Sequence, residues 1–124
     1  MTPAQLKYTK DHEWITDDKK CASVGVTKYA IEQLGDIVHL DLPQVGTEYT
    51  SGDSFGTIES TKTVSDLYMP VSGKVVEVNK SLLGKLESLA ENPYEGWLVR
   101  IELTNPTELS SLMDAKSYES FVAQ

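Results

Sequence analysis

The sequence predicts a mainly β protein, a sandwich or flattened barrel of short strands with a short internal helix and C-terminal helices. Two observations indicate this class. Eight glycines and five prolines divide the 124 residues into short pieces, and most pieces alternate apolar and polar side chains with period two. Short strands at this spacing are typical of sandwiches and barrels. We expect a single domain over residues 1–124, with the sandwich at about 7–103 and a helical segment at about 105–122.

Seven strands are expected from this alternation. In chain order they are Glu13–Thr16, Cys21–Val26, Ile37–Leu42, Phe55–Thr61, Val64–Met69, Gly73–Asn79 and Trp97–Leu103. The first two form a hairpin across the turn Asp17–Lys20. The third ends at Pro43, because proline has no amide hydrogen for a ladder. The fourth and fifth face each other across a very short connection whose tip holds Lys62.

Three segments depart from the β pattern. Thr27–Gly35 has an N-cap residue, apolar positions at helical spacing and a terminating glycine, which predicts a short helix. Asn105–Glu108 offers a capping side chain followed by proline and a carboxylate, which predicts a second helix start, and another turn begins at Asp114. Ser81–Pro93 mixes helical spacing with glycine and proline, so we expect a loop with helical turns.

Glycines and tryptophans are expected in structural roles. Gly35, Gly46 and Gly73 fit turn or cap positions, and Trp14 and Trp97 fit the core. None of the five offers reactive chemistry.

The charge balance excludes several partners. The chain has 11 basic against 19 acidic residues, a formal charge of −8, and Arg100 is its only arginine. A phosphate backbone rewards clustered basic residues, so nucleic acid is not an expected partner. No stretch approaches the roughly 20 apolar residues of a membrane span, and the residues from Met1 to Lys7 lack the apolar centre of a signal peptide.

The single cysteine limits cross-links. Cys21 has no second cysteine with which to form an internal disulfide or a thiolate zinc site, so a reducing compartment is the simpler interpretation. We expect it to be a small core residue inside its strand.

No enzymatic site is indicated. His12 and His39 are the only histidines, and the His12-Glu13 pair lacks the second histidine of a zinc-protease helix, since position 16 is threonine. A Gly-x-Ser-x-Gly turn is absent. The glycines near Gly52 and Gly56 are not followed by a predicted helix, as a phosphate-binding loop requires.

Lys62 stands apart from the other cations. It is the only basic residue between Glu48 and Met69, and it lies at a predicted reversal beside small residues. An exposed lysine with a pKa of about 10.4 is a poor nucleophile and is most often a solvated surface residue. A modifying enzyme could nevertheless acylate it there. The residues alone permit an attachment site without naming the attached group.

Several blocks of the sequence resemble the glycine cleavage system H-protein family in order and spacing, over roughly residues 7 to 120. The blocks are Lys7–Trp14, Val24–Thr27, Leu34–Val38, Leu42–Gly46, Glu59–Lys62, Ser65–Gly73, Val76–Asn79 and Gly96–Leu98. So many blocks in the correct order form a far stronger match than any one motif.

The resemblance implies a lipoyl/biotinyl-domain-like β sandwich whose Lys62 carries lipoic acid in amide linkage. It implies a carrier rather than an enzyme: the arm takes an aminomethyl group from glycine at a pyridoxal-phosphate decarboxylase (P protein). A folate-dependent aminomethyltransferase (T protein) then removes that group, and dihydrolipoyl dehydrogenase (L protein) reoxidises the arm. A lipoate-attaching enzyme is a further implied partner, and a carrier that visits all of them is expected to be a monomer.

The resemblance also implies supporting residues. Glu13 and Asp66 match acidic positions that hold the loaded arm, with a solvated surface acid as the alternative for each. Gln33 stands where some members have a histidine, so it could hydrogen-bond but not titrate. Glu59 and Ser60 match positions that help the lipoate-attaching enzyme recognise the hairpin.

The chain departs from the family pattern beside the lysine. Thr61 and Thr63 replace the valine and alanine common in other members, and both threonines suit a strand. Two other functions stay open: an H-like protein that relays lipoyl groups to other complexes, and an unlipoylated interaction module. A bacterial cytoplasm is expected, or the mitochondrial matrix for a mature eukaryotic form.

Overall fold

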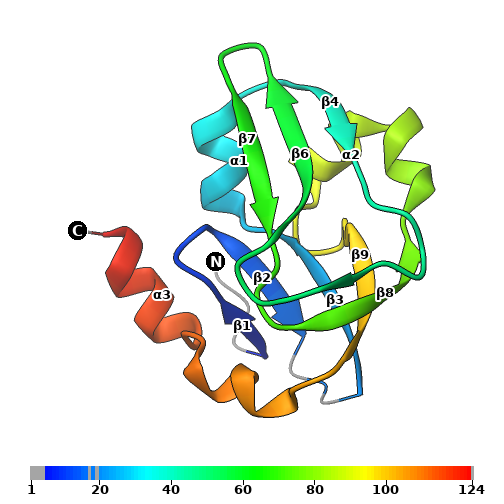
Figure 1. The fold of residues 1–124 in the computed structure, drawn as a ribbon. Helices are drawn as coiled ribbons and strands as arrows, with labels where there is room; N and C mark the ends of the chain where they lie inside the picture. Colours follow the sequence, from blue (N-terminus) through cyan, green and yellow to red (C-terminus); the bar gives the residue numbers. More distant parts are fainter. Residues whose placement is uncertain (1–4, 17, 19, 124) are drawn as a thin grey trace.

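The computed structural model describes residues 5–16, 18 and 20–123, and it is built from two antiparallel sheets. The strands are β1 (Leu6–Tyr8), β2 (Glu13–Thr16), β3 (Cys21–Val26), β4 (Ile37–Asp41), β5 (Glu48–Tyr49), β6 (Ser54–Ser60), β7 (Val64–Tyr68), β8 (Gly73–Val78) and β9 (Val99–Leu103). A six-stranded sheet has the order β1-β2-β3-β9-β8-β5, and a three-stranded sheet has the order β4-β6-β7. Neither sheet closes on itself, so the molecule is a sandwich rather than a barrel (Figure 1).

Helical segments fill the connections. They are α1 (Lys28–Leu34), η1 (Lys80–Gly84), α2 (Leu86–Glu91), η2 (Pro106–Ser111) and α3 (Ala115–Val122), where η marks a 3₁₀ helix. None of the helices in the described ranges is long and apolar enough to cross a membrane. In Figure 1, α1 lies beside the upper part of β7, and α3 runs past β1.

The apolar residues of both sheets face one continuous core. Ile58 of β6 and Leu67 of β7 pack from one sheet, and Val24 and Ile101 pack from the other, each at most 2% exposed. A second cluster, around Trp14 and the tyrosines of β1 and α3, joins the C-terminal helix to the larger sheet. The sandwich is therefore a rigid support for the hairpin of β6 and β7, which projects at the top of Figure 1.

Helix α1 follows the sequence prediction closely. The Thr27 hydroxyl accepts a hydrogen bond from the Ala30 amide at 3.2 Å, which satisfies one of the free amides of the first turn. Gly35 ends the helix at φ +84°, a left-handed conformation that glycine adopts without steric cost. Ile31 and Leu34 are buried against the core.

Four expectations are wrong in detail. Cys21 is exposed at the first position of β3, where its side chain lies outside the core. Gly73 is the first residue of β8, where the strand prediction placed it, and it pairs with Tyr49 and Leu103 instead of occupying a turn. Trp97 is only half-buried, with the Arg100 guanidinium 4.0 Å above its ring. Asn105 makes no side-chain cap, and the 3₁₀ helix η2 follows it.

The remaining differences concern short elements. β1 and β5 have three and two residues, too few to show an alternation. The helical turns expected within Ser81–Pro93 are present as η1 and α2, with η1 beginning one residue earlier. Residues 17 and 19 of the predicted turn Asp17–Lys20, and the first four residues of the chain, lie outside the described residues.

Candidate functional site

Lys62 lies at the tip of the β6–β7 hairpin. The two strands pair with the register Thr57↔Asp66, Ile58↔Ser65 and Glu59↔Val64, and Thr61, Lys62 and Thr63 form the exposed connection. The tip is tied to the body of the protein by a hydrogen bond from the Thr61 amide to the Asp36 carbonyl at 3.0 Å. The lysine backbone is therefore held in place while its side chain is exposed.

Ser60 shapes the turn that presents the lysine. It is 5% exposed, and its hydroxyl oxygen accepts hydrogen bonds from the amides of Lys62 and Thr63, each at 3.2 Å. The Ser60 amide also donates to the Thr63 carbonyl at 2.8 Å. Because its hydroxyl is engaged inside the turn, Ser60 determines the shape of the tip rather than offering a group to a partner. Glu59, the residue before it, is half-buried.

The Lys62 amine is available for modification. Among the residues described, the one ion pair joins Arg100 and Glu77 at 2.9 Å, on the opposite sheet. The lysine chain lies over Gly35: a β-carbon built on that glycine would stand 3.5 Å from Lys62 Cε. The lysine side chain thus passes across the end of α1, the helix that also lines the cavity described next.

A cavity of about 140 Å³ brings together three of the predicted site residues: Glu13 of β2, Gln33 of α1 and Asp66 of β7. The other lining residues are Asp11, His12, Val26, Ala30, Leu34, Ile58, Ser65 and Leu67. One wall is the turn between β1 and β2, another is α1, and a third is the β6–β7 hairpin. The cavity therefore lies on the same hairpin as Lys62 and beside the helix that its side chain crosses.

Glu13 is the buried member of the set. It is 2% exposed, and its Oε2 accepts a hydrogen bond from the Tyr68 amide at 2.6 Å, which links the two sheets. Its Oε1 is the one buried side-chain nitrogen or oxygen atom in the described part of the chain that has no hydrogen-bond partner. Burial raises the pKa of this carboxyl to about 8; the charge of Asp11 acts in the same direction, and the Tyr68 amide and the Thr9 hydroxyl oppose it.

Asp66 and Gln33 lie on the exposed rim of the cavity. The Asp66 carboxylate accepts weak hydrogen bonds from the Ser54 and Tyr68 hydroxyls, both at 3.4 Å. The three residues therefore offer one buried carboxyl, one solvated carboxylate and one amide around a common space. That arrangement suits a small cationic group with hydrogens to donate.

His12 also lines the cavity, although sequence reasoning assigned it no role. Its φ of +65° is the one positive value at a non-glycine residue in the described ranges. Its Nδ1 lies 2.8 Å from the Tyr118 hydroxyl, which is 106 positions away in sequence. Burial lowers its pKa, and the nearby charge of Asp11 acts in the opposite direction. Its position directly before Glu13 was the one signal in the sequence.

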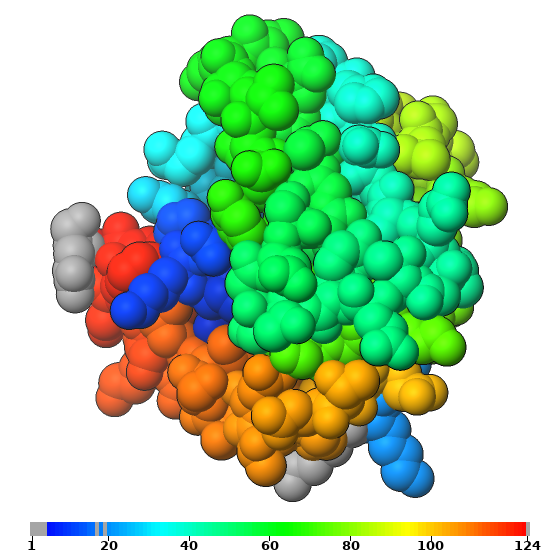
Figure 2. Space-filling model, in the orientation of Figure 1, coloured from blue at the N-terminus to red at the C-terminus, as the bar shows by residue number. Residues whose placement is uncertain are grey.

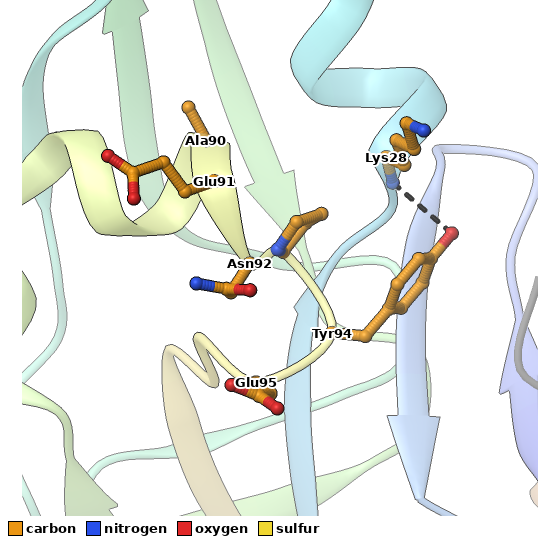
Figure 3. Close-up of a pocket in the computed structure, with 7 residues that line it drawn as sticks. Lys28, Ala90, Glu91, Asn92, Tyr94 and Glu95 are labelled. Carbon is orange, nitrogen blue, oxygen red and sulfur yellow. Dashed lines mark hydrogen bonds between the residues drawn. The ribbon is translucent and has the colours of Figure 1, made fainter. Parts of the chain in front are cut away.

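Other hollows in the described part of the chain lack a buried, unpartnered polar side-chain atom like that of Glu13. One of about 280 Å³ lies beside the start of α1, where the Tyr94 hydroxyl accepts a hydrogen bond from the Lys28 amide at 3.2 Å. Figure 3 shows the Tyr94 ring extending toward that amide, with the carboxylates of Glu91 and Glu95 well apart. Among the described residues that line this hollow, no buried side-chain nitrogen or oxygen lacks a hydrogen-bond partner. Nowhere in the described residues do three or more His, Cys, Asp or Glu side chains form a group that could hold a metal ion.

Comparison with known proteins agrees with this arrangement. The sequence profile of the glycine cleavage H-protein family matches residues 6–124. A glycine cleavage system H protein of Symbiobacterium thermophilum is 50% identical over 123 residues, covering 98% of this chain and 96% of its own. One from Staphylococcus epidermidis is 45% identical, with 98% of each chain covered. The crystal structure of a glycine cleavage system H protein from Mycobacterium marinum superposes with a TM-score of 0.90 at 39% identity, covering 98% of this chain and 99% of that one. The chain belongs to the glycine cleavage H-protein family.

Proposed function

We propose that this protein is the lipoyl carrier of a glycine cleavage system, with lipoic acid attached to Lys62 and its aminomethyl cargo received by the cavity at Glu13. The observation that carries the proposal is the buried, unpartnered Oε1 of Glu13. A buried polar atom without a partner is costly and rare, and it is explained when a ligand supplies the missing hydrogen bond. A cationic ammonium is the donor that best matches a carboxyl group there.

Lys62 fits the attachment. It is exposed at the tip of a rigid hairpin and makes no ion pair within the described residues, so a modifying enzyme can reach it without breaking a native contact. We infer that this enzyme recognises the turn formed by Glu59 and Ser60. Amide formation removes the positive charge of Lys62, which takes the formal charge of the chain from −8 to −9.

When attached, the lipoyl group supplies the disulfide chemistry that accepts the aminomethyl group of glycine and later releases it. The chain's own contribution is to hold and shield the cargo. At neutral pH the carboxyl of Glu13, with a pKa of about 8, is mostly protonated when no cation is near it. An ammonium group brought to its Oε1 favours the ionised carboxylate, because a nearby opposite charge lowers a carboxyl pKa. Asp66 adds a second negative charge at the rim, and Gln33 an amide.

The partners follow from this cycle: the glycine decarboxylase, the aminomethyltransferase, dihydrolipoyl dehydrogenase and a lipoate-attaching enzyme. A carrier that serves several enzymes needs fast association with each of them, which electrostatic attraction favours. The net charge of −8 makes basic patches on the partners the expected counterpart. A monomer in a bacterial cytoplasm is consistent with this traffic and with the bacterial relatives.

The attachment is tested by intact-mass measurement after co-production with a lipoate ligase. Wild type should gain one lipoyl group, and Lys62→Arg should gain none. Lys74→Arg, at an exposed strand position, is the matched control and should be modified like wild type. An unmodified wild type, or a modified Lys62→Arg, would overturn the proposed attachment.

The role in glycine cleavage is tested with the lipoylated chain and a glycine decarboxylase. The proposal predicts exchange of labelled bicarbonate into the carboxyl group of glycine, dependent on Lys62. Full lipoylation without exchange would instead support relay of lipoyl groups to other complexes. Neither modification nor exchange would leave an interaction module.

A further inference from the structure

The hydroxyl of Tyr118 joins two segments that are far apart in sequence. Tyr118 lies on α3 and is 2% exposed. Its hydroxyl oxygen lies 2.8 Å from His12 Nδ1 and 2.7 Å from Thr27 Oγ1. One phenol oxygen therefore holds together the turn before β2 and the cap of α1.

Both segments contribute to the walls of the cavity. His12 directly precedes Glu13, the buried carboxyl, and both residues line the cavity. Thr27 caps α1, whose residues Ala30 and Gln33 also line it. Figure 2 shows the N-terminal segment (blue) lying between α3 (red) and the strands that follow residue 50 (green). Tyr118 does not line the cavity itself, and its hydroxyl contacts one residue in each of the two segments that do.

The hydrogen bonds can run in one consistent direction. Thr27 Oγ1 already accepts from the Ala30 amide at 3.2 Å, so its hydrogen is free for Tyr118. The Tyr118 hydroxyl can then donate to His12 Nδ1, which accepts when the imidazole is neutral. The rings of Tyr29 and Phe121 lie 4.6 and 5.9 Å from the His12 ring between centroids and keep it in place.

The backbone of His12 shows why such support is needed. A residue with a β-carbon at φ +65° is held in a sparsely populated conformation, which persists only where surrounding contacts enforce it. The Thr27 amide donates to the His12 carbonyl at 3.0 Å, so the same two residues are joined by a backbone bond. This conformation is the last step of the turn that delivers Glu13 into the cavity.

We propose that Tyr118 is a positioning residue for the cargo cavity, acting through His12 and Thr27 to keep the Glu13 carboxyl enclosed. The role rests on the proposed function of that cavity. Without the phenol oxygen, the turn and the helix are joined by fewer bonds, and water reaches Glu13 more often. The C-terminal helix therefore contributes to the site although it contains no cavity-lining residue.

The first test needs no lipoyl group. The Glu13 carboxyl is titrated by ¹³C NMR in the full chain and in Tyr118→Phe, which removes only the hydroxyl. We expect the Glu13 pKa to be lower in the variant by roughly one unit, because hydration stabilises the ionised form. Tyr94→Phe is the matched control: Tyr94 is half-buried, and within the described residues its hydroxyl is hydrogen-bonded to the Lys28 amide alone. It should leave the Glu13 titration unchanged. A Glu13 titration in Tyr118→Phe equal to that of wild type would overturn the proposal.

The second test uses the fully lipoylated, cargo-loaded chain and follows the loss of the aminomethyl group to water. Tyr118→Phe should release it about fivefold faster than wild type or Tyr94→Phe, a factor typical of one lost hydrogen bond. His12→Asn, which tolerates the positive φ, should also release faster, and it decides the question if Tyr118→Phe does not fold. Equal release rates in wild type, Tyr118→Phe and His12→Asn would count against the proposal. If wild type cannot be lipoylated or loaded, the proposed function fails, and the NMR titration alone still decides the role of Tyr118.

Discussion

The hairpin tip and the cavity beside it differ in how far their side chains are exposed to solvent. At the tip, residues 61–64 are exposed and only the backbone is constrained, through the buried Ser60 hydroxyl. In the cavity, Glu13 is 2% exposed, and one of its carboxyl oxygens has no partner within the described residues. An attachment point must be accessible to several enzymes, whereas a holding site gains from the exclusion of water. The molecule therefore places the accessible attachment point at the tip of the β6–β7 hairpin and the enclosed holding site against the body of the same hairpin.

The largest effect expected from this contrast is the pH dependence of stability at Glu13. Its pKa is about 8 in the folded protein against an ordinary 4.5, so between these values the folded state keeps a proton that the unfolded state loses. Stability from this group therefore falls as pH rises from about 4.5 to about 8, and it is level outside that window. Glu13→Gln should remove the fall, on the order of 5 kcal/mol.

Urea unfolding of wild type and Glu13→Gln at several pH values measures the difference directly. Glu102→Gln, which removes an exposed carboxylate on β9, is the control for the loss of one acid. Its free energy of unfolding should change with pH as that of wild type does. If the stability difference between Glu13→Gln and wild type is the same at pH 5 and pH 8, Glu13 is hydrated like the tip.

A smaller effect is expected at the turn. Ser60→Ala leaves the amides of Lys62 and Thr63 without their acceptor, and should lower the free energy of unfolding by about 1–2 kcal/mol. The looser tip should also be lipoylated more slowly at equal ligase concentration. Thr63→Ala, whose hydroxyl makes only a 3.5 Å contact with the Val64 carbonyl, serves as the control. Equal lipoylation rates in the two variants would mean that the shape of the turn is not recognised.

The smallest effect on stability is expected at Lys62 itself. Its side chain is exposed and makes no ion pair among the described residues, so Lys62→Arg should change the free energy of unfolding by no more than about 0.5 kcal/mol. Thermal unfolding followed by circular dichroism is sufficient. A large loss would show that the tip lysine supports the fold and would remove the contrast between the two regions.

Local sequence patterns predicted the hairpin tip. The cavity residues Glu13, Gln33 and Asp66 were predicted only from the family resemblance. The β6–β7 hairpin, the position of Lys62 and the capped helix α1 depend on neighbouring residues, which the sequence displays directly. The burial of Glu13 depends on strand β7, more than 50 positions away, whose Tyr68 amide it binds. Alternation also could not show that β2 is covered on both faces, so a solvated Glu13 remained an open alternative.

Longer-range features left weaker signals still. The Tyr118 hydroxyl reaches His12 and Thr27 across 106 and 91 positions, and nothing in the local pattern relates them. Cys21 was assigned to the core because it belongs to an apolar strand, yet it stands at the first, exposed position of that strand. Where a side chain's role depends on which end or face of an element it occupies, period-two patterns alone were insufficient.

The most direct measurement of the central claim compares cargo loss to water from fully lipoylated, loaded wild type and Glu13→Gln at neutral pH. The amide that replaces the carboxyl cannot ionise beside an ammonium group, so the variant should lose the aminomethyl group on the order of tenfold faster, a factor within the range for a hydrogen bond to a charged group. Asp66→Asn, at the solvated rim, should show a smaller increase. Wild type and Glu13→Gln losing cargo at the same rate would contradict the account, because the buried carboxyl would then play no part in holding it.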